Sequence, residues 1–243
     1  MDDVTHAELE SILVEGARQL GICVAERPAR AMVEYLLALL QTNEHVNLTR
    51  IAAPRDAVRL HLLDSLAAAP ELGASPAGPA IDIGSGGGFP GVPLALHSGR
   101  EFVLLDSVGK KAAAVQAILD RMDPMVTART VSARAEDEAR AEPGHFAVAV
   151  ARAVAPLAAL VELAAPLLWR GGHLIALKGT PSEAELASGL RAAEIVGMKV
   201  RGSRALTLPG SNERRQVVVY EKVRAPTIAL PRRSGSAQHR PLA

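Results

Sequence analysis

The stretch Ala80-Ile81-Asp82-Ile83-Gly84-Ser85-Gly86-Gly87-Gly88-Phe89-Pro90-Gly91 decides the fold of this chain. Its first four residues place apolar side chains around one acid, which predicts a short buried strand. The glycines that follow allow a tight turn and a close approach of the backbone to a ligand. Pro93 and the apolar residues after it predict the first turn of a helix. A strand, a glycine-rich loop and a helix start together are typical of sites for nucleotide-like cofactors.

The spacing of the glycines separates two kinds of cofactor. The dinucleotide pattern G-x-G-x-x-G, begun at Gly84, requires glycine at position 89, where this chain has Phe89. The pattern acid-x-G-x-G-x-G does fit, through Asp82, Gly84, Gly86 and Gly88. This second pattern is the motif of class I methyltransferases, which bind S-adenosylmethionine. Phe89 therefore disfavours a pyrophosphate site, and the second pattern favours a site for S-adenosylmethionine.

A second strand is predicted over 102–106, and it ends in an acid. Asp106 lies 22 residues beyond Gly84. An acid at about that distance is placed to accept hydrogen bonds from ribose hydroxyls. The loop, the strand and the acid in register indicate a cofactor site far more specifically than the loop does alone.

Composition limits the class of protein. The chain has 243 residues, 49 % of them hydrophobic, enough for one full domain core with a helical extension. The single cysteine, Cys23, excludes a disulfide framework and a cysteine metal cluster, and we expect it to be buried. No apolar stretch reaches membrane-spanning length without a charge, and the start Met1-Asp2-Asp3 is unlike a signal peptide. We expect a cytoplasmic protein that holds no metal and does not bind membranes.

The basic residues are unevenly distributed. Residues 224–243 carry Arg224, Arg232, Arg233 and Arg240 and no acid, whereas the rest of the chain has slightly more acids than bases. A nucleic-acid surface on the body must therefore be a local patch. The segment 224–243 is also rich in Pro, Ser and Gly, which predicts disorder. A solvated appendage is favoured over a specific RNA contact.

Hydrophobic periodicity predicts the order of the elements. Helices are expected over 5–20, 28–40, 56–69, 110–122, 156–168 and 182–194, with another from residue 91, and a linker over 70–79. Strands are expected over 80–83, 102–106, 126–131, 146–151 and 173–177, with a closing antiparallel pair over 199–206 and 216–223. This alternation predicts an α/β fold with a mostly parallel, seven-stranded, Rossmann-like sheet. The division is a helical extension (1–72), a cofactor domain (79–223) and a basic tail (224–243).

Several segments match one family in order along the chain. They are Asn47-Leu48-Thr49, His61-Leu62-Leu63-Asp64-Ser65, the loop 82–93, Leu104-Leu105-Asp106-Ser107, Ala151-Arg152-Ala153 and Leu177-Lys178-Gly179. From about residue 35 to 222 the chain resembles the bacterial small-subunit ribosomal RNA methyltransferase G family, also called glucose-inhibited division protein B. The resemblance implies an S-adenosylmethionine-dependent enzyme that methylates N7 of one guanine in the 530 loop of 16S ribosomal RNA. Whether its partner is naked RNA or the 30S subunit stays open, and we expect a monomer.

The resemblance also implies which residues hold each ligand. For the cofactor these are Asp82, Gly84, Gly86, Gly88, Phe89, Asp106, Ala135, Glu136 and Arg152. The backbone amide of Ala135 and the carboxylate of Glu136 would read the amino edge of adenine. Arg152 would hold a phosphate or the methionine carboxylate, or serve only in a structural ion pair. Candidates for the guanine pocket or the RNA contact are His61, Asp64, Ser65, Arg152 and Lys178.

His61, Asp64 and Ser65 also invite a hydrolase-triad interpretation. On one helix they lie side by side, whereas a triad needs a linear relay onto a nucleophile. We expect them instead to pack the N-terminal helix against the cofactor loop, or to line the guanine pocket. No catalytic general base is expected, because guanine N7 carries a lone pair and no proton.

Two other functions remain open at this point. A methyltransferase for a small molecule or a protein would share the cofactor residues and differ in the N-terminal helices. A non-catalytic cofactor-sensing protein is also possible, because a binding loop alone does not prove turnover.

Overall fold

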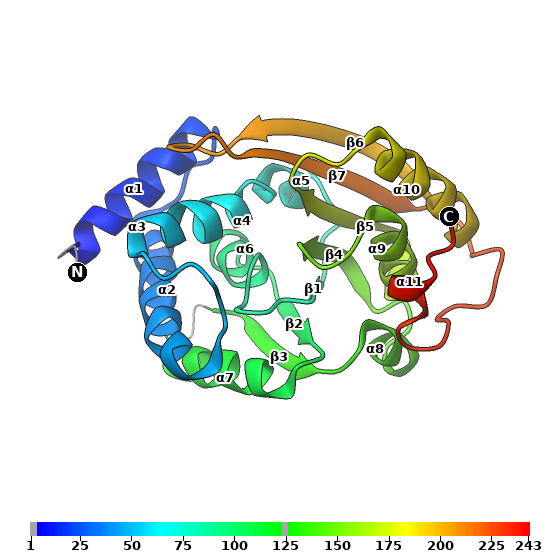
Figure 1. The fold of residues 1–243 in the computed structure, drawn as a ribbon, viewed down its shortest axis with the longest axis horizontal. Helices are drawn as coiled ribbons and strands as arrows, with labels where there is room; N and C mark the ends of the chain where they lie inside the picture. The colour runs from blue at the N-terminus through cyan, green and yellow to red at the C-terminus, as the bar shows by residue number, and fades with distance from the viewer. Residues whose placement is uncertain (1–3, 123–125) are drawn as a thin grey trace.

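The computed structural model describes residues 4–122 and 126–243, in which one sheet of seven strands has the order β3-β2-β1-β4-β5-β7-β6 (Figure 1). β1 to β5 are parallel, and β7 runs antiparallel to both β5 and β6. The strands are β1 (Ala80–Ile83), β2 (Phe102–Asp106), β3 (Ala128–Ser132), β4 (Phe146–Arg152), β5 (Leu168–Lys178), β6 (Met198–Thr207) and β7 (Arg214–Lys222). The predicted fold class is confirmed, including the closing antiparallel pair.

Helices cover both faces of this sheet, and alternate residues of each strand point to opposite faces. One face packs against α1 (His6–Gln19), α2 (Glu26–Val46), α6 (Gly91–Ser98) and α7 (Gly109–Leu119). The other packs against α8 (Ala135–Ala141), α9 (Leu157–Ala164), α10 (Glu183–Val196) and α11 (Ser236–His239). Leu104 of β2 joins the first core, for example, and its neighbours Val103 and Leu105 join the second.

Residues 54–73 bring the chain from α2 to the sheet. α3 (Pro54–Ala57), the π-helix η1 (Val58–Leu63) and α4 (Asp64–Leu66) follow one another without a break. The predicted helix 56–69 is thus present with a wider central turn, of a kind that recurs at functional sites. A further short helix, α5 (Ala69–Gly73), occupies the start of the predicted linker.

The N-terminal helices share their core with the sheet and hold the glycine-rich loop directly. Tyr35 of α2 is fully buried, and its hydroxyl donates a hydrogen bond of 2.8 Å to the carbonyl of Gly87. Gly88 has a φ of +81°, and a side chain there would collide with the Tyr35 hydroxyl. Glycine is therefore required at position 88 by the close approach of α2 as well as by the turn.

The prediction that residues 224–243 are disordered is wrong. The segment returns across α10, α9 and α8 and forms α11 near the C-terminus (Figure 1). Arg232 donates two hydrogen bonds, of 2.7 and 2.6 Å, to the carboxylate of Glu162, which is only 4 % exposed. The composition of this segment favours disorder, but composition gives no information on contacts. A buried acid on α9 needs a cation, and Arg232 of this segment supplies it.

Three observations concern the expectations drawn from composition. Cys23 is exposed, so its expected burial is wrong. Among the described helices none is long and apolar enough to span a membrane. Across residues 4–122 and 126–243, no three His, Cys, Asp or Glu side chains gather as a metal site would require.

Asp82 joins the end of β1 to the start of α6. Its side chain is fully buried, and Oδ2 accepts a hydrogen bond of 2.8 Å from the backbone N–H of Gly91. Oδ1 has no hydrogen-bond partner within the described part of the chain. Burial raises the pKa of Asp82 from 3.8 to about 7.

Stability should therefore fall with pH through this carboxyl group. The folded protein binds the Asp82 proton more tightly than the unfolded chain does, so the stabilisation is complete below about pH 4 and is lost as the pH rises toward about 7. Asp82→Asn keeps an acceptor and stays neutral, so its free energy of unfolding should fall less over this interval. Urea unfolding of both proteins at several pH values measures the difference. Parallel pH profiles would contradict it.

Candidate functional site

Two cavities lie at the edge of the sheet where the parallel strands end. Ligands bind at this edge in open α/β folds because the loops that follow the strands form crevices there. The register places Ile83 of β1 beside Leu105 of β2, and Arg152 of β4 beside Leu177 of β5. The ends of four strands thus contribute to one region of the surface.

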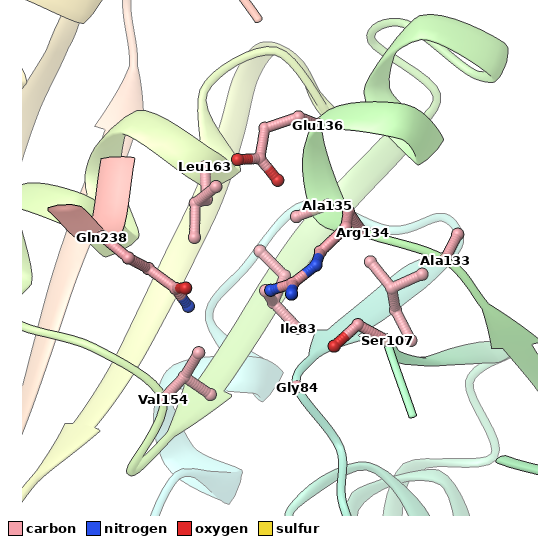
Figure 2. Close-up of a pocket in the computed structure, with 11 residues that line it drawn as sticks. Ile83, Gly84, Ser107, Ala133, Arg134, Ala135, Glu136, Val154, Leu163 and Gln238 are labelled. Carbon is pink, nitrogen blue, oxygen red and sulfur yellow. The ribbon is translucent and has the colours of Figure 1, made fainter. Parts of the chain in front are cut away.

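The first cavity lies between the start of the glycine-rich loop and the segments before α8 and α9 (Figure 2). Its lining residues are Ile83, Gly84, Leu105, Ser107, Ala133, Arg134, Ala135, Glu136, Val154, Leu163 and Gln238. The sequence predicted Gly84, Ala135 and Glu136 as cofactor residues. It missed Val154 and Leu163, and it also missed Gln238, which comes from α11 in the supposedly disordered tail.

Asp106 closes β2 next to this cavity and holds the loop. Its Oδ2 accepts 2.9 Å from the N–H of Gly86, and its Oδ1 accepts 2.8 Å from the N–H of Val108. A carboxylate offers about four lone-pair positions, so two remain for a ligand. Gly86 has a φ of +55°, and a side chain built on it would meet no atom within 4 Å. The loop therefore leaves open space beside an acid with spare acceptor capacity, which fits a ribose.

Glu136 begins α8 and is 7 % exposed. Its Oε1 accepts a hydrogen bond of 2.7 Å from the backbone N–H of Gly235, immediately before α11. The acid predicted to read a ligand thus also fixes the C-terminal segment against the cavity.

Three of the predicted cofactor residues lie behind the loop rather than in the cavity. Asp82 is buried under α6, and Gly88 faces Tyr35. The ring of Phe89 stacks on the ring of His61, with centroids 4.6 Å apart and planes 4° from parallel. These residues shape the loop through the elements packed on it.

The second cavity has a volume of about 420 Å³ and lies beside η1. It is lined by Leu60, His61, Asp64, Arg152, Ala153, Leu177, Lys178, Gly179 and Arg215. Four of the five predicted pocket or RNA residues are therefore brought together here. Ser65 is the exception, because it is fully buried and its hydroxyl donates 2.6 Å to the carbonyl of His61.

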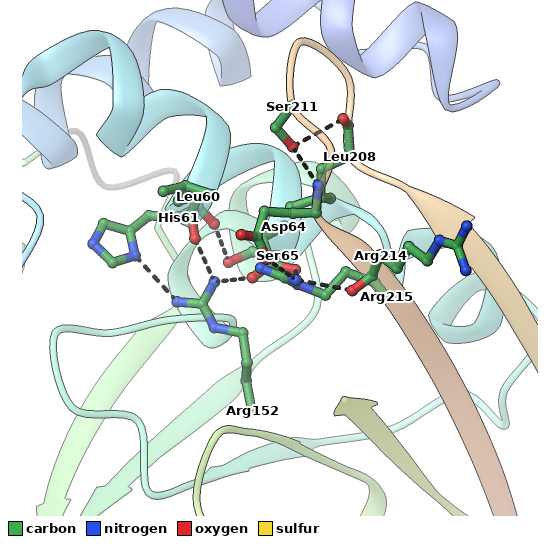
Figure 3. A network of polar contacts seen from close by, with 10 residues as sticks. Leu60, His61, Asp64, Ser65, Arg152, Leu208, Ser211, Arg214 and Arg215 are labelled. Carbon is green, nitrogen blue, oxygen red and sulfur yellow. Dashed lines mark hydrogen bonds and ion pairs between the residues drawn. The ribbon is translucent and has the colours of Figure 1, made fainter. Parts of the chain in front are cut away.

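Asp64 lies between two arginines from different strands (Figure 3). Its Oδ2 is 3.0 Å from Nη1 of Arg152, and its Oδ1 is 2.9 Å from Nε of Arg215. Arg152 also donates 2.9 Å to the carbonyl of Leu60 and lies 5.6 Å from the centre of the Phe89 ring. The sequence left a structural ion pair as one of the possible roles of Arg152, and this ion pair is present. Arg215 had not been singled out from the sequence.

His61 uses both ring nitrogens inside the protein. Arginine has no acceptor, so Nδ1 accepts from Arg152 at 3.3 Å, and Nε2–H must then donate to the Thr49 hydroxyl at 2.7 Å. Burial, with Arg152 nearby, lowers the pKa of His61 to about 4. The imidazole is neutral near pH 7, and neither Ser65 nor Asp64 forms a triad with it.

Lys178 is also engaged within the protein. Its ammonium group lies 2.8 Å from Oε1 of Glu185 and donates 3.0 Å to the carbonyl of Ala155. The side chain of Lys178 is therefore held in a fixed position at the rim of the cavity.

Ala153 separates the two cavities. It has a φ of +55°, a left-handed conformation that is uncommon for a residue other than glycine. Arg152 and Ala153 line the second cavity, whereas Val154 lines the first and would meet any side chain added at Gly84. Backbone strain of this kind clusters at functional sites.

Comparisons with known proteins bear on this arrangement. A family model described as rRNA small subunit methyltransferase G matches residues 29–217. A protein named ribosomal RNA small subunit methyltransferase G from Deinococcus deserti is 39 % identical over 98 % of this chain and 98 % of its own length. Another of the same name, from Roseiflexus castenholzii, is 40 % identical over 95 % of this chain and 98 % of its own.

Solved structures agree with the fold. A 16S ribosomal RNA adenine-N1 methyltransferase from Catenulisporales acidiphilia has a TM-score of 0.50 at 15 % identity, covering 65 % of this chain and 90 % of its own. A geranyl diphosphate methyltransferase has a TM-score of 0.50 at 15 % identity, covering 67 % of this chain and 75 % of its own. At such low identity these likenesses show the fold alone.

The family model spans most of the chain, and the relatives match it along nearly its whole length. The chain belongs to the family of ribosomal RNA small subunit methyltransferase G, an S-adenosylmethionine-dependent family.

Proposed function

We propose that this chain transfers a methyl group from S-adenosylmethionine to N7 of a guanine in the 530 loop of 16S ribosomal RNA, in the cytoplasm. The observation that carries the proposal is the placing of two cavities on either side of Ala153. One suits an adenosine and the other a nucleobase, so the two reacting groups would meet at the end of β4. The family to which the chain belongs supports ribosomal RNA as the substrate.

The adenosine half of the cofactor would occupy the first cavity. Its walls include the apolar side chains of Ile83, Leu105 and Leu163, which suit a flat aromatic base. Asp106 would accept from the ribose hydroxyls, as the sequence predicts. The N–H of Ala135 and the carboxylate of Glu136 would read the adenine edge.

The second cavity would receive the guanine. Arg152, Arg215 and Lys178 line it, and each of them is paired with an acid: Asp64, Glu213 or Glu185. Guanidinium and ammonium groups fixed at a cavity in this way can donate hydrogen bonds to the base or the phosphate of an RNA nucleotide. A single base swung out of its stack is the form in which enzymes reach a buried atom of a base.

The chemistry requires positioning above all. S-adenosylmethionine supplies a methyl group on a positively charged sulfur, and guanine N7 supplies a lone pair without a proton to remove. The residues of this chain therefore need only hold the two groups in line and exclude water. The engaged ring nitrogens of His61 and the paired ammonium of Lys178 suit such a role.

Substitution of Asp106 tests the placing of the ribose. Asp106→Ala removes charge-assisted hydrogen bonds worth roughly 1.5–3 kcal/mol, which corresponds to a loss of about ten- to a hundredfold in affinity. Isothermal titration with S-adenosylhomocysteine measures this loss. Because Asp106 also holds Gly86, a 2′-deoxy analogue serves as a control. The natural protein should prefer the ribose form, and the variant should not. An unaltered preference in the variant would refute the placing.

The pH dependence of the chemical step tests the absence of a general base. Above the titration of Asp82 and below that of guanine N1–H, from about pH 7.5 to 8.5, the single-turnover rate on 30S particles should stay flat when both substrates are saturating. The same should hold for His61→Ala, Asp64→Asn and Lys178→Ala, whatever their absolute rates. A rise with pH that disappears in one of these variants would identify a base and overturn this mechanism.

The RNA substrate itself is tested in a deletion strain. Mass analysis of its 16S ribosomal RNA should find an unmethylated guanine in the 530 loop, and restoring the gene should return the methyl group. A fully methylated guanine in the deletion strain would point instead to a small-molecule or protein substrate, or to a non-catalytic role.

A further inference from the structure

The C-terminal segment, residues 224–243, is anchored beside the first cavity by polar contacts, one of them to a buried acid. Arg232 forms a two-pronged ion pair with Glu162, and the carbonyl of Arg232 accepts 2.8 Å from Arg140 of α8. Ser234 donates 3.0 Å to Asp137, also of α8. An acid as buried as Glu162 would be left uncompensated if Arg232 moved away, so this anchor is costly to release.

A second set of contacts fixes α11 itself. The N–H of Gly235 is bonded to the buried carboxylate of Glu136, and Ala237 is buried in the core between the sheet and α9. With these two preceding residues held, Gln238 lies beside the cavity. Figure 2 shows its carboxamide directed into the cavity, across from Arg134.

We propose that Gln238 recognises the adenine of S-adenosylmethionine, with its Oε1 accepting a hydrogen bond from the 6-amino group. A glutamine side chain offers an acceptor and a donor side by side and pairs well with the amino edge of adenine. The amino group has two hydrogens, so Gln238 can share it with Glu136, whose Oε1 already accepts from Gly235. The inference rests on the cofactor placement proposed above.

The geometry around Gln238 strengthens this assignment. Val154 and Leu163 lie on its side of the cavity, and Ile83 forms part of the floor. Gln238 itself is exposed, and these apolar side chains would shield its hydrogen bond from water once adenine occupies the cavity. The carboxamide is thus an uncharged polar group placed to select a base in this cavity, as the hydroxyl of Ser107 also is.

The experiment compares two ligands in titrations of the full chain. They are S-adenosylhomocysteine and its analogue with purine in place of adenine, which lacks only the amino group. Gln238→Ala should weaken binding of the adenine ligand by about three- to tenfold and leave the purine ligand nearly unchanged. Gln238→Glu keeps an acceptor and should retain the preference for adenine. His239→Ala, on the same helix, is the matched control and should behave as the unsubstituted protein.

The outcomes separate recognition from packing. Equal loss of both ligands in Gln238→Ala, or no loss of either, overturns the proposal. If Asp106→Ala also binds S-adenosylhomocysteine with unaltered affinity, the cofactor placement has failed. If Asp106→Ala weakens binding while Gln238→Ala does not, only the present inference has failed.

Limited proteolysis gives a second measurement, and its result does not depend on a change in the affinity for S-adenosylhomocysteine. Trypsin cleaves after exposed arginines that no proline follows, and exposed Arg233 lies shortly before α11. If Gln238 contacts the cofactor, S-adenosylhomocysteine should slow cleavage after Arg233 in the unsubstituted protein. The protection should be smaller in Gln238→Ala at equal occupancy of the cofactor site. Equal protection in both proteins would count against the contact.

Discussion

The carboxylate of Asp64, buried between Arg152 and Arg215, is the interaction on which the site depends. It joins the helical segment 54–66 to β4 and to β7, two strands on either side of β5. Removing one member of such a buried cluster leaves a charge without compensation, at a cost of roughly 3–5 kcal/mol. The N-terminal helices are therefore tied to the part of the sheet edge where the second cavity lies.

The same attachment determines the shape of the glycine-rich loop. With η1 held by Asp64, the ring of His61 lies flat on Phe89. The hydroxyl of Tyr35 meets the Gly87 carbonyl from α2. The outer side of the loop therefore packs against the N-terminal helices, which are additional to the alternating strands and helices of the α/β fold. Its inner side, at Gly86, remains open to a ligand. A rigid loop loses little conformational entropy on binding.

The sequence predicted the fold and several residues that line the two cavities, because elements and the residues that end strands are recorded in local patterns. Alternating strands and helices determine a parallel sheet, and Asp106 follows its strand directly. The glycine motif located the loop, but it gave no sign that Gly88 packs on Tyr35 or that Phe89 stacks on His61, since glycine spacing reflects backbone conformation and not side-chain packing. Arg215 and Gln238 could not be found this way. Arg215 pairs with Asp64, and Gln238 joins a cavity lined mostly by residues 83–163; both sets lie far away in the sequence, and no periodicity marks either residue. Glu162 is an acid within the apolar run of α9. It was a local sign that a cation from a distant part of the sequence must pack against this helix, as Arg232 does.

The position of α11 has a consequence for a shortened chain. All seven strands described here precede residue 224, whereas the first cavity takes one wall from Gln238. A chain that ended shortly after β7 would therefore hold every strand of the sheet, but it would lack Ala237 in the second core. It would also leave the acid of Glu162 unpaired and the cavity open on one side.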